Sequence, residues 1–231
     1  MNRIKHHRIA NLTHAVICIL GVLILASCVA SHQTFQMDNA SAGVETILVL
    51  PFQNLHAEYG DSVRIDCTFC NRRHVVGEVP QGALEFMTEH LKKLLMNDSS
   101  YRFVFPEPSG EISSDMPADE NGVVRMTDLV RSNRETDSED AILTGYLFRF
   151  KERVGKRYSV ESPASVAFSL FLFRVSDGQI LWRGIFEETQ QSLSENFLKL
   201  GTFLKRKARW VTARELAADG LENLILTLPK P

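Results

Sequence analysis

The first half of the chain carries the apolar patterns of two strands and two helices. Residues 45–52 contain the run Ile-Leu-Val-Leu followed by a proline, which predicts a buried strand. Residues 81–97 follow a proline and carry apolar side chains at helical spacing, which predicts an amphipathic helix. A short strand is predicted at 101–105 and a short helix at 126–133. The long stretch 53–80 shows no clear period, and we expect it to be irregular.

Three longer strands are predicted in the second half, at 141–152, 163–175 and 179–190. The last two are joined by Ser-Asp-Gly-Gln at 176–179, and Asp-Gly between apolar runs is typical of a hairpin. The middle strand is apolar on both faces: Val166, Phe168, Leu170 and Leu172 lie on one, and Ala167, Phe171, Phe173 and Val175 on the other. We therefore expect this strand to be central and covered on both sides, and the third strand to lie at an edge.

Two helices are predicted to finish the chain, at 194–208 and 212–226. Thr212 and Glu215 stand at capping-box spacing at the start of the second one. The order of elements predicts an α/β sandwich, with helices packed on a mixed sheet of about five strands.

The N-terminal segment has the pattern of an export signal. Arg3, Lys5 and Arg8 precede an apolar run over residues 15–26, and no acidic residue stands among them. The run is shorter than the roughly 20 residues that cross a bilayer stably. It ends in Leu-Ala-Ser-Cys at residues 25–28.

These four residues resemble the lipobox of bacterial lipoproteins. The resemblance implies cleavage before Cys28 and acyl chains such as palmitate on that cysteine, where more than one chain is needed for stable anchoring. It divides the chain into a signal peptide (1–27), a lipidated N-terminus with a flexible tether (28–44) and a single α/β domain (45–231). Val29 in place of aspartate implies the outer membrane and a periplasmic domain. An uncleaved anchor and a plain secretory signal are the alternatives.

The charge of the mature chain limits the classes of partner. Removal of residues 1–27 takes three of the 26 basic and none of the 28 acidic residues, which leaves 23 against 28, a net charge near −5. General nucleic-acid binding requires a basic surface, so no nucleic-acid partner is expected. The sequence contains no G-x-S-x-G, H-E-x-x-H or P-loop motif, and we expect neither an enzyme nor a bound cofactor.

Cys67 and Cys70 form a C-x-x-C pair inside the irregular stretch. An oxidising periplasm allows a disulfide between them. A metal site would use both cysteines and His74, with His56 or Asp66 as a fourth ligand, although a second pair at the usual zinc-site distance is missing. A redox-active thiol pair is the third possibility, since nearby arginines favour thiolate.

Three short motifs, at 47–52, 141–145 and 175–182, resemble those of the small domain found in the N-terminal part of TolB and in periplasmic lipoproteins of the LpoB and CsgG type. The resemblance covers about residues 45–190. It implies an α/β fold, an envelope location and a role as partner or regulator of envelope machinery, and it implies no catalytic residues.

We therefore expect a non-enzymatic envelope lipoprotein that serves as an accessory or scaffold for a protein machine. Anchoring would raise the effective concentration of the domain near its partner. The candidate contact residues are basic or aromatic: Arg72, Arg73, Lys205, Arg206, Lys207, Arg209 and Trp210. The alternative is a metal-binding or thiol-redox protein that uses the Cys67, Cys70 and His74 loop.

Overall fold

The computed structural model describes residues 32–36, 42–54, 63–67, 72–106, 139–156, 159–190 and 210–231. Several predictions lie outside these residues: the signal peptide with Cys28, the helices at 126–133 and 194–208, Cys70, and the basic residues Lys205, Arg206, Lys207 and Arg209. Among the residues that are described, no helix is long and apolar enough to cross a membrane.

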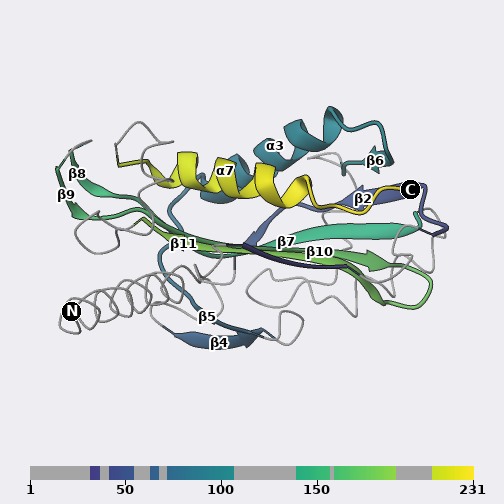
Figure 1. Ribbon diagram of the computed structural model, residues 1–231, viewed down its shortest axis with the longest axis horizontal. Coiled ribbons are helices and arrows are strands. Elements are labelled where there is room, and N and C mark those ends of the chain that lie inside the picture. The colour runs from purple at the N-terminus through teal and green to yellow at the C-terminus, as the bar shows by residue number, and fades with distance from the viewer. Residues whose placement is uncertain are drawn as a thin grey trace, which may run out of the picture.

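A seven-stranded mixed sheet forms the centre of the domain (Figure 1). Its strands are β1 (His32–Gln36), β2 (Thr46–Val49), β3 (Gln53–Asn54), β6 (Arg102–Val104), β7 (Ala141–Lys151), β10 (Ser165–Arg174) and β11 (Ile180–Thr189). Their order is β1-β11-β10-β7-β2-β6, with β3 also paired to β7. Strand β2 runs parallel to β6 and β7, whereas β7, β10 and β11 are antiparallel. The five predicted strands are all present, and the predicted mixed-sheet fold is confirmed.

Strand β10 is the middle of the sheet and is buried on both faces, as predicted. Its residues Val166, Phe168, Leu170 and Leu172 belong to the larger apolar core. Ala167, Phe171 and Phe173 belong to a smaller core on the other face. The pleat alone separates these two sets, because neighbouring residues of a strand point to opposite sides.

Two helices cover one face of the sheet: α3 (Ala83–Met96) and α7 (Ala213–Ile225) (Figure 1). Their apolar faces bury residues such as Met87, Leu91 and Leu221 in the larger core. The predicted capping box starts α7, since the Thr212 side chain accepts from the Glu215 N–H and the Glu215 carboxylate accepts from the Thr212 N–H.

Strand β1 corrects two predictions. Residues 32–36 were expected to be part of a flexible tether, but they pair antiparallel with β11 from His32 opposite Phe186 to Gln36 opposite Trp182. Strand β11, expected at an edge, therefore lies between β1 and β10. The side chains of Gln33 to Gln36 are exposed, so this strand lacks the buried face that a hydrophobic pattern would reveal.

Two hairpins form small sheets of their own beside the central sheet, and the first corrects the expectation that 53–80 is irregular. Strands β4 (Arg64–Cys67) and β5 (Arg72–Val75) pair antiparallel and lie on the face opposite the helices (Figure 1). Strands β8 (Val154–Lys156) and β9 (Ser159–Ser162) form a second hairpin directly after β7, at one end of the molecule.

Candidate functional site

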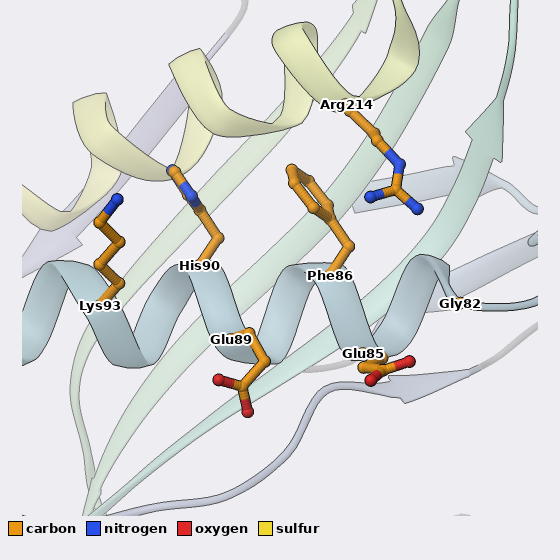
Figure 2. A pocket seen from close by; sticks show the side chains of 7 residues that line it. All are labelled: Gly82, Glu85, Phe86, Glu89, His90, Lys93 and Arg214. Atoms are coloured by element: carbon orange, nitrogen blue, oxygen red, sulfur yellow. The ribbon is translucent and has the colours of Figure 1, made fainter.

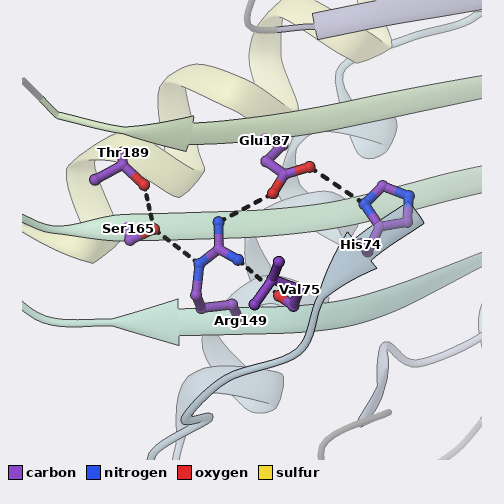
Figure 3. A network of polar contacts seen from close by, with 6 residues as sticks. All are labelled: His74, Val75, Arg149, Ser165, Glu187 and Thr189. Carbon is purple, nitrogen blue, oxygen red and sulfur yellow. Dashed lines mark hydrogen bonds and ion pairs between the residues drawn. The ribbon is translucent and has the colours of Figure 1, made fainter. Parts of the chain in front are cut away.

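A network of polar side chains fastens the β4–β5 hairpin to the sheet (Figure 3). The Arg149 guanidinium, on β7, donates through Nη1 to the Val75 carbonyl at 2.6 Å, through Nε to Ser165 Oγ at 2.8 Å and through Nη2 to Glu187 Oε1 at 3.2 Å. The Ser165 hydroxyl also bonds the Thr189 hydroxyl at 2.6 Å. One arginine thus joins the hairpin to β10 and β11, using the fork of donors that distinguishes it from lysine.

The close approach of Arg149 to the hairpin depends on Gly77. A Cβ atom at Gly77 would lie 3.0 Å from both Cγ and Cδ of Arg149. The Gly77 N–H donates to the Phe148 carbonyl at 2.9 Å, so the chain leaving β5 is hydrogen-bonded to β7 at the same place.

His74 is the second contact between hairpin and sheet. Its side chain is fully buried and its ring stacks on Phe148, with centroids 4.1 Å apart and an interplanar angle of 11°. Its Nδ1 atom lies 3.4 Å from Glu187 Oε2, which is long for a hydrogen bond. This contact with His74 lowers the pKa of Glu187; burial opposes the lowering and the Arg149 guanidinium adds to it. The network therefore holds Glu187 as a carboxylate between two partners.

The outer face of the β4–β5 hairpin is exposed. Arg64 pairs with Val75 across the ladder, and all three of Arg64, Arg73 and Val75 point away from the sheet and are exposed. Because side chains alternate along a strand, burial of His74 leaves its neighbours Arg73 and Val75 on the outside. We call the surface formed by Arg64, Arg73 and Val75 the hairpin face. It is a basic and partly apolar surface on a hairpin that is held at its base.

The structure brings only part of the predicted C-x-x-C site together. The backbone of Cys67 lies in β4 opposite Arg72, two residues from His74 on the neighbouring strand. Cys70 and His56 lie outside the described residues, so the disulfide, metal and redox possibilities all stay predictions. Within the described part of the chain no group of three or more His, Cys, Asp or Glu side chains is placed to hold a metal ion.

A polar groove of about 550 Å³ lies along α3 and the start of α7 (Figure 2). Phe86 and His90 point from α3 toward α7, where Arg214 lies over the Phe86 ring at 4.9 Å from its centroid. Glu85 and Glu89 point away from α7. Lys93 and Gly82 complete the groove, and none of the lining residues that the structure describes carries a hydroxyl or thiol nucleophile. It offers charged contacts on both sides.

Trp210 is half-buried just before α7, and it is the only member of the predicted basic run that is described. Among the other predicted contact residues, Arg73 is exposed on the hairpin face, and the backbone of Arg72 lies in β5. Sequence reasoning missed Arg64, Arg149 and Glu187. The signal for the last two was a charged residue inside a strand that is otherwise apolar, since such residues are seldom buried without a partner.

No protein-family model matches the chain, and no curated protein matches it. Several solved structures are similar in shape. The PelC dodecamer from Paraburkholderia phytofirmans gives a TM-score of 0.48 at 10% identity, covering 84% of this chain and 93% of that one. Lipoprotein GNA1162 from Neisseria meningitidis gives 0.38 at 12% identity, covering 71% and 98%. The LpoB C-terminal domain from Salmonella enterica gives 0.35 at 15% identity, covering 65% and 93%. At TM-scores below 0.5 these likenesses carry no argument about function, and the fold class stands on the sheet topology of the chain itself.

Proposed function

We propose that this chain is a non-enzymatic lipoprotein of the bacterial envelope, anchored through Cys28 to the outer membrane, which binds a protein partner with the hairpin face. The anchor confines the domain to a thin layer and raises its effective concentration toward a partner in the same layer. The proposal joins a location, taken from the N-terminal sequence, to a contact surface, taken from the structure.

The Leu-Ala-Ser-Cys sequence at 25–28 supports the location. It follows a basic segment and an apolar run of signal-peptide length. Only three residues separate Cys28 from His32, where the first strand of the sheet begins. A folded domain that starts so soon after the cysteine would stay close to the membrane.

The hydrogen bonds of Arg149 to Val75, Ser165 and Glu187, which we call the clamp, are the main support for the hairpin face as the contact surface. A two-stranded hairpin is marginally stable by itself in water. Here Arg149 bonds the Val75 carbonyl and the buried His74 ring stacks on Phe148, so the hairpin has a fixed position. A surface that is already fixed loses less conformational entropy on binding, which favours its use in recognition. The exposed arginines fit an acidic surface on the partner.

The test is capture of envelope proteins with full-length wild-type protein, extracted in mild detergent, beside two charge-reversal variants. Arg73→Glu changes the hairpin face, and Lys93→Glu makes the same change on the exposed surface of α3 as the matched control. We expect one captured protein to be lost with Arg73→Glu and kept with Lys93→Glu. Equal capture by all three proteins would refute the hairpin face as the contact surface.

The location is tested separately. The mature protein should partition into the detergent-rich phase and carry acyl chains on its N-terminal cysteine by mass spectrometry. Cys28→Ala should be released as a water-soluble or unprocessed protein. Partition that does not depend on Cys28 would contradict the lipid anchor.

A metal-binding function is the second candidate, and one observation favours it. His74 Nε2 is buried and has no hydrogen-bond partner among the described residues. Nitrogen of a neutral imidazole is a common zinc ligand, and the backbone of Cys67 lies close by in β4. Metal analysis of protein purified without chelator tests it: one equivalent of zinc that is lost in His74→Phe would support a metal centre, and a metal-free protein would contradict it.

A further inference from the structure

The end of the sheet at which β7 and β11 finish is separate from the proposed contact surface and lies near the start of β1. Lys151, at the end of β7, pairs with Ser165, which in turn pairs with Thr189 at the end of β11. His32 pairs with Phe186, three residues from Thr189 on the same strand. The strand that follows the proposed anchor therefore begins near the end of the sheet at which β7 leaves it.

The chain length limits the distance between the anchor and this end of the sheet. Cys28 is four residues from His32, so its Cα lies at most about 14 Å from that of His32, whatever path the chain takes. Lys151 lies three strands across and three residues along from His32, which amounts to roughly 17 Å at ordinary sheet spacing. A lipid on Cys28 must therefore be attached to the chain within about 14 Å of His32.

The β8–β9 hairpin projects beyond this end of the sheet (Figure 1). Val154, its first residue, is 50% exposed although it is apolar. Residues 151–162 contain four basic and two acidic residues, in a mature chain whose net charge is near −5. Lys151 is exposed and Arg153 half-buried, and one of the two acids, Glu152, accepts a hydrogen bond from the Ala213 N–H at 3.0 Å.

The segment before α7 lies at the same end of the sheet. The Val211 N–H donates to the Gln190 side chain at 2.8 Å, and Gln190 directly follows β11. Trp210 is thereby placed near the end of the sheet from which the β8–β9 hairpin projects. Half-buried tryptophan and basic residues are the side chains that favour a membrane interface.

We propose that this end of the sheet rests on the membrane, with Lys151 and Arg153 contacting anionic lipid headgroups and Val154 at the interface. The inference rests on the lipid anchor of the proposed function and adds an orientation to it. The occupant of the surface is the lipid of the membrane that holds the anchor. Helix α7 then leads away from the membrane, because its first N–H is held at this end by Glu152 and its 13 residues extend about 20 Å.

Fluorescence quenching in proteoliposomes measures this orientation. Mature, lipidated Val154→Trp is reconstituted in vesicles of zwitterionic and anionic phospholipid, with and without bromine on the acyl chains. Leu226→Trp, 81% exposed at the far end of α7, is the matched control. Both sites are at least half exposed, so either variant should fold. Trp182 and Trp210 are common to both proteins, so the difference between the two signals reports the introduced residue.

We expect bromolipid to quench Val154→Trp more strongly than Leu226→Trp, whose quenching should equal that of the wild-type protein, in which Trp182 and Trp210 are the tryptophans. Lys151→Glu in the Val154→Trp protein should lower the ratio of docked to undocked protein by at least roughly fivefold, since that is the effect of removing one basic charge near an anionic surface and the added acid acts in the same direction. Lys93→Glu should have no such effect. Salt near 1 M, where the Debye length falls to about 3 Å, should weaken docking in the same way.

The outcomes separate the two proposals. Membrane retention that depends on Cys28, with equal or no quenching at the two sites, would overturn the orientation and leave the anchor standing. Quenching at Leu226→Trp alone would show the opposite orientation. A protein that is not retained by membranes would overturn both.

Discussion

Removal of the Arg149 guanidinium should loosen the β4–β5 hairpin before it unfolds the domain. In Arg149→Leu the alkyl part of the side chain is replaced, while the bonds to the Val75 carbonyl, Ser165 and Glu187 are lost. The arginine side chain is only 13% exposed and that of Glu187 27%, so the carboxylate keeps one long contact to His74 and limited access to water.

The size of the effect follows from what each partner retains. A hydrogen bond to a charged group contributes about 1.5–3 kcal/mol. The sum over the three lost bonds is therefore the upper limit of the loss in the free energy of unfolding. Ser165 keeps its bond to Thr189, which reduces the loss there. Breaking a buried pair costs about 3–5 kcal/mol, and partial exposure of Glu187 favours the lower end. We therefore expect a loss of about 3 kcal/mol in the free energy of unfolding.

Urea unfolding measures the global loss, and amide hydrogen exchange locates it. The Gly77 N–H donates to Phe148 where the chain leaves the hairpin, so its exchange should accelerate most. The Leu50 N–H donates to Leu143 inside the sheet and serves as the reference amide. Arg149→Lys keeps the charge and tests whether the fork geometry is needed. A loss below about 1 kcal/mol, or equal acceleration at Gly77 and Leu50, would refute the clamp.

The pKa of Glu187, the packing at Gly220 and the state of Cys67 and Cys70 can each be tested. Because the pKa of Glu187 is lowered by its contact with His74 and by Arg149, its contribution to stability is present above its unfolded value of 4.5 and is lost as the pH falls below it; Glu187→Gln should flatten the acid limb of a stability-against-pH curve, and an unchanged limb would contradict this. Gly220→Ala should destabilise the protein by about 1 kcal/mol by urea unfolding, because its Cβ would lie 2.8 Å from the Phe186 ring and overpacking should outweigh the helix-propensity gain; a rise in stability would show that the ring can move. If Cys67 and Cys70 form a disulfide, intact mass should show alkylation of both only after reduction, whereas two thiols alkylated without reduction would favour the metal or redox alternative.

The fold could be predicted from the sequence wherever burial follows a simple period. Strand β10 carries apolar residues on both faces, and its central place was evident from that pattern. The capping box at Thr212 marked the start of α7 for a local reason that does not depend on packing. The Asp-Gly turn was recognisable because tight hairpin turns need positive φ, which glycine adopts readily, and Gly178 has a φ of 76°.

The remaining elements could not be found in this way, because their strands have little or no apolar face. Strand β1 is exposed along Gln33 to Gln36 and is held by pairing with β11. In β4–β5 the buried side chain among those the structure describes is that of His74, which pairs with Glu187 on a distant strand. The clamp depends on contacts between distant strands, and no local spacing in the sequence reveals which arginine meets which carboxylate.

The position of β1 also has a mechanical consequence. In the proposed orientation, tension applied through Cys28 would act along β1, so the hydrogen bonds of the β1–β11 ladder would resist together, as in shear. If Cys28 carries lipid as proposed, that lipid would be attached within about 14 Å of His32 while the ladder holds. Detachment of β1 would free at most the chain from Cys28 to Val44, which is buried in the larger core; these 16 residues extend to roughly 55 Å. For the proposed lipid-anchored protein, the pairing of this five-residue strand would set how far from the lipid surface the domain can bind a partner.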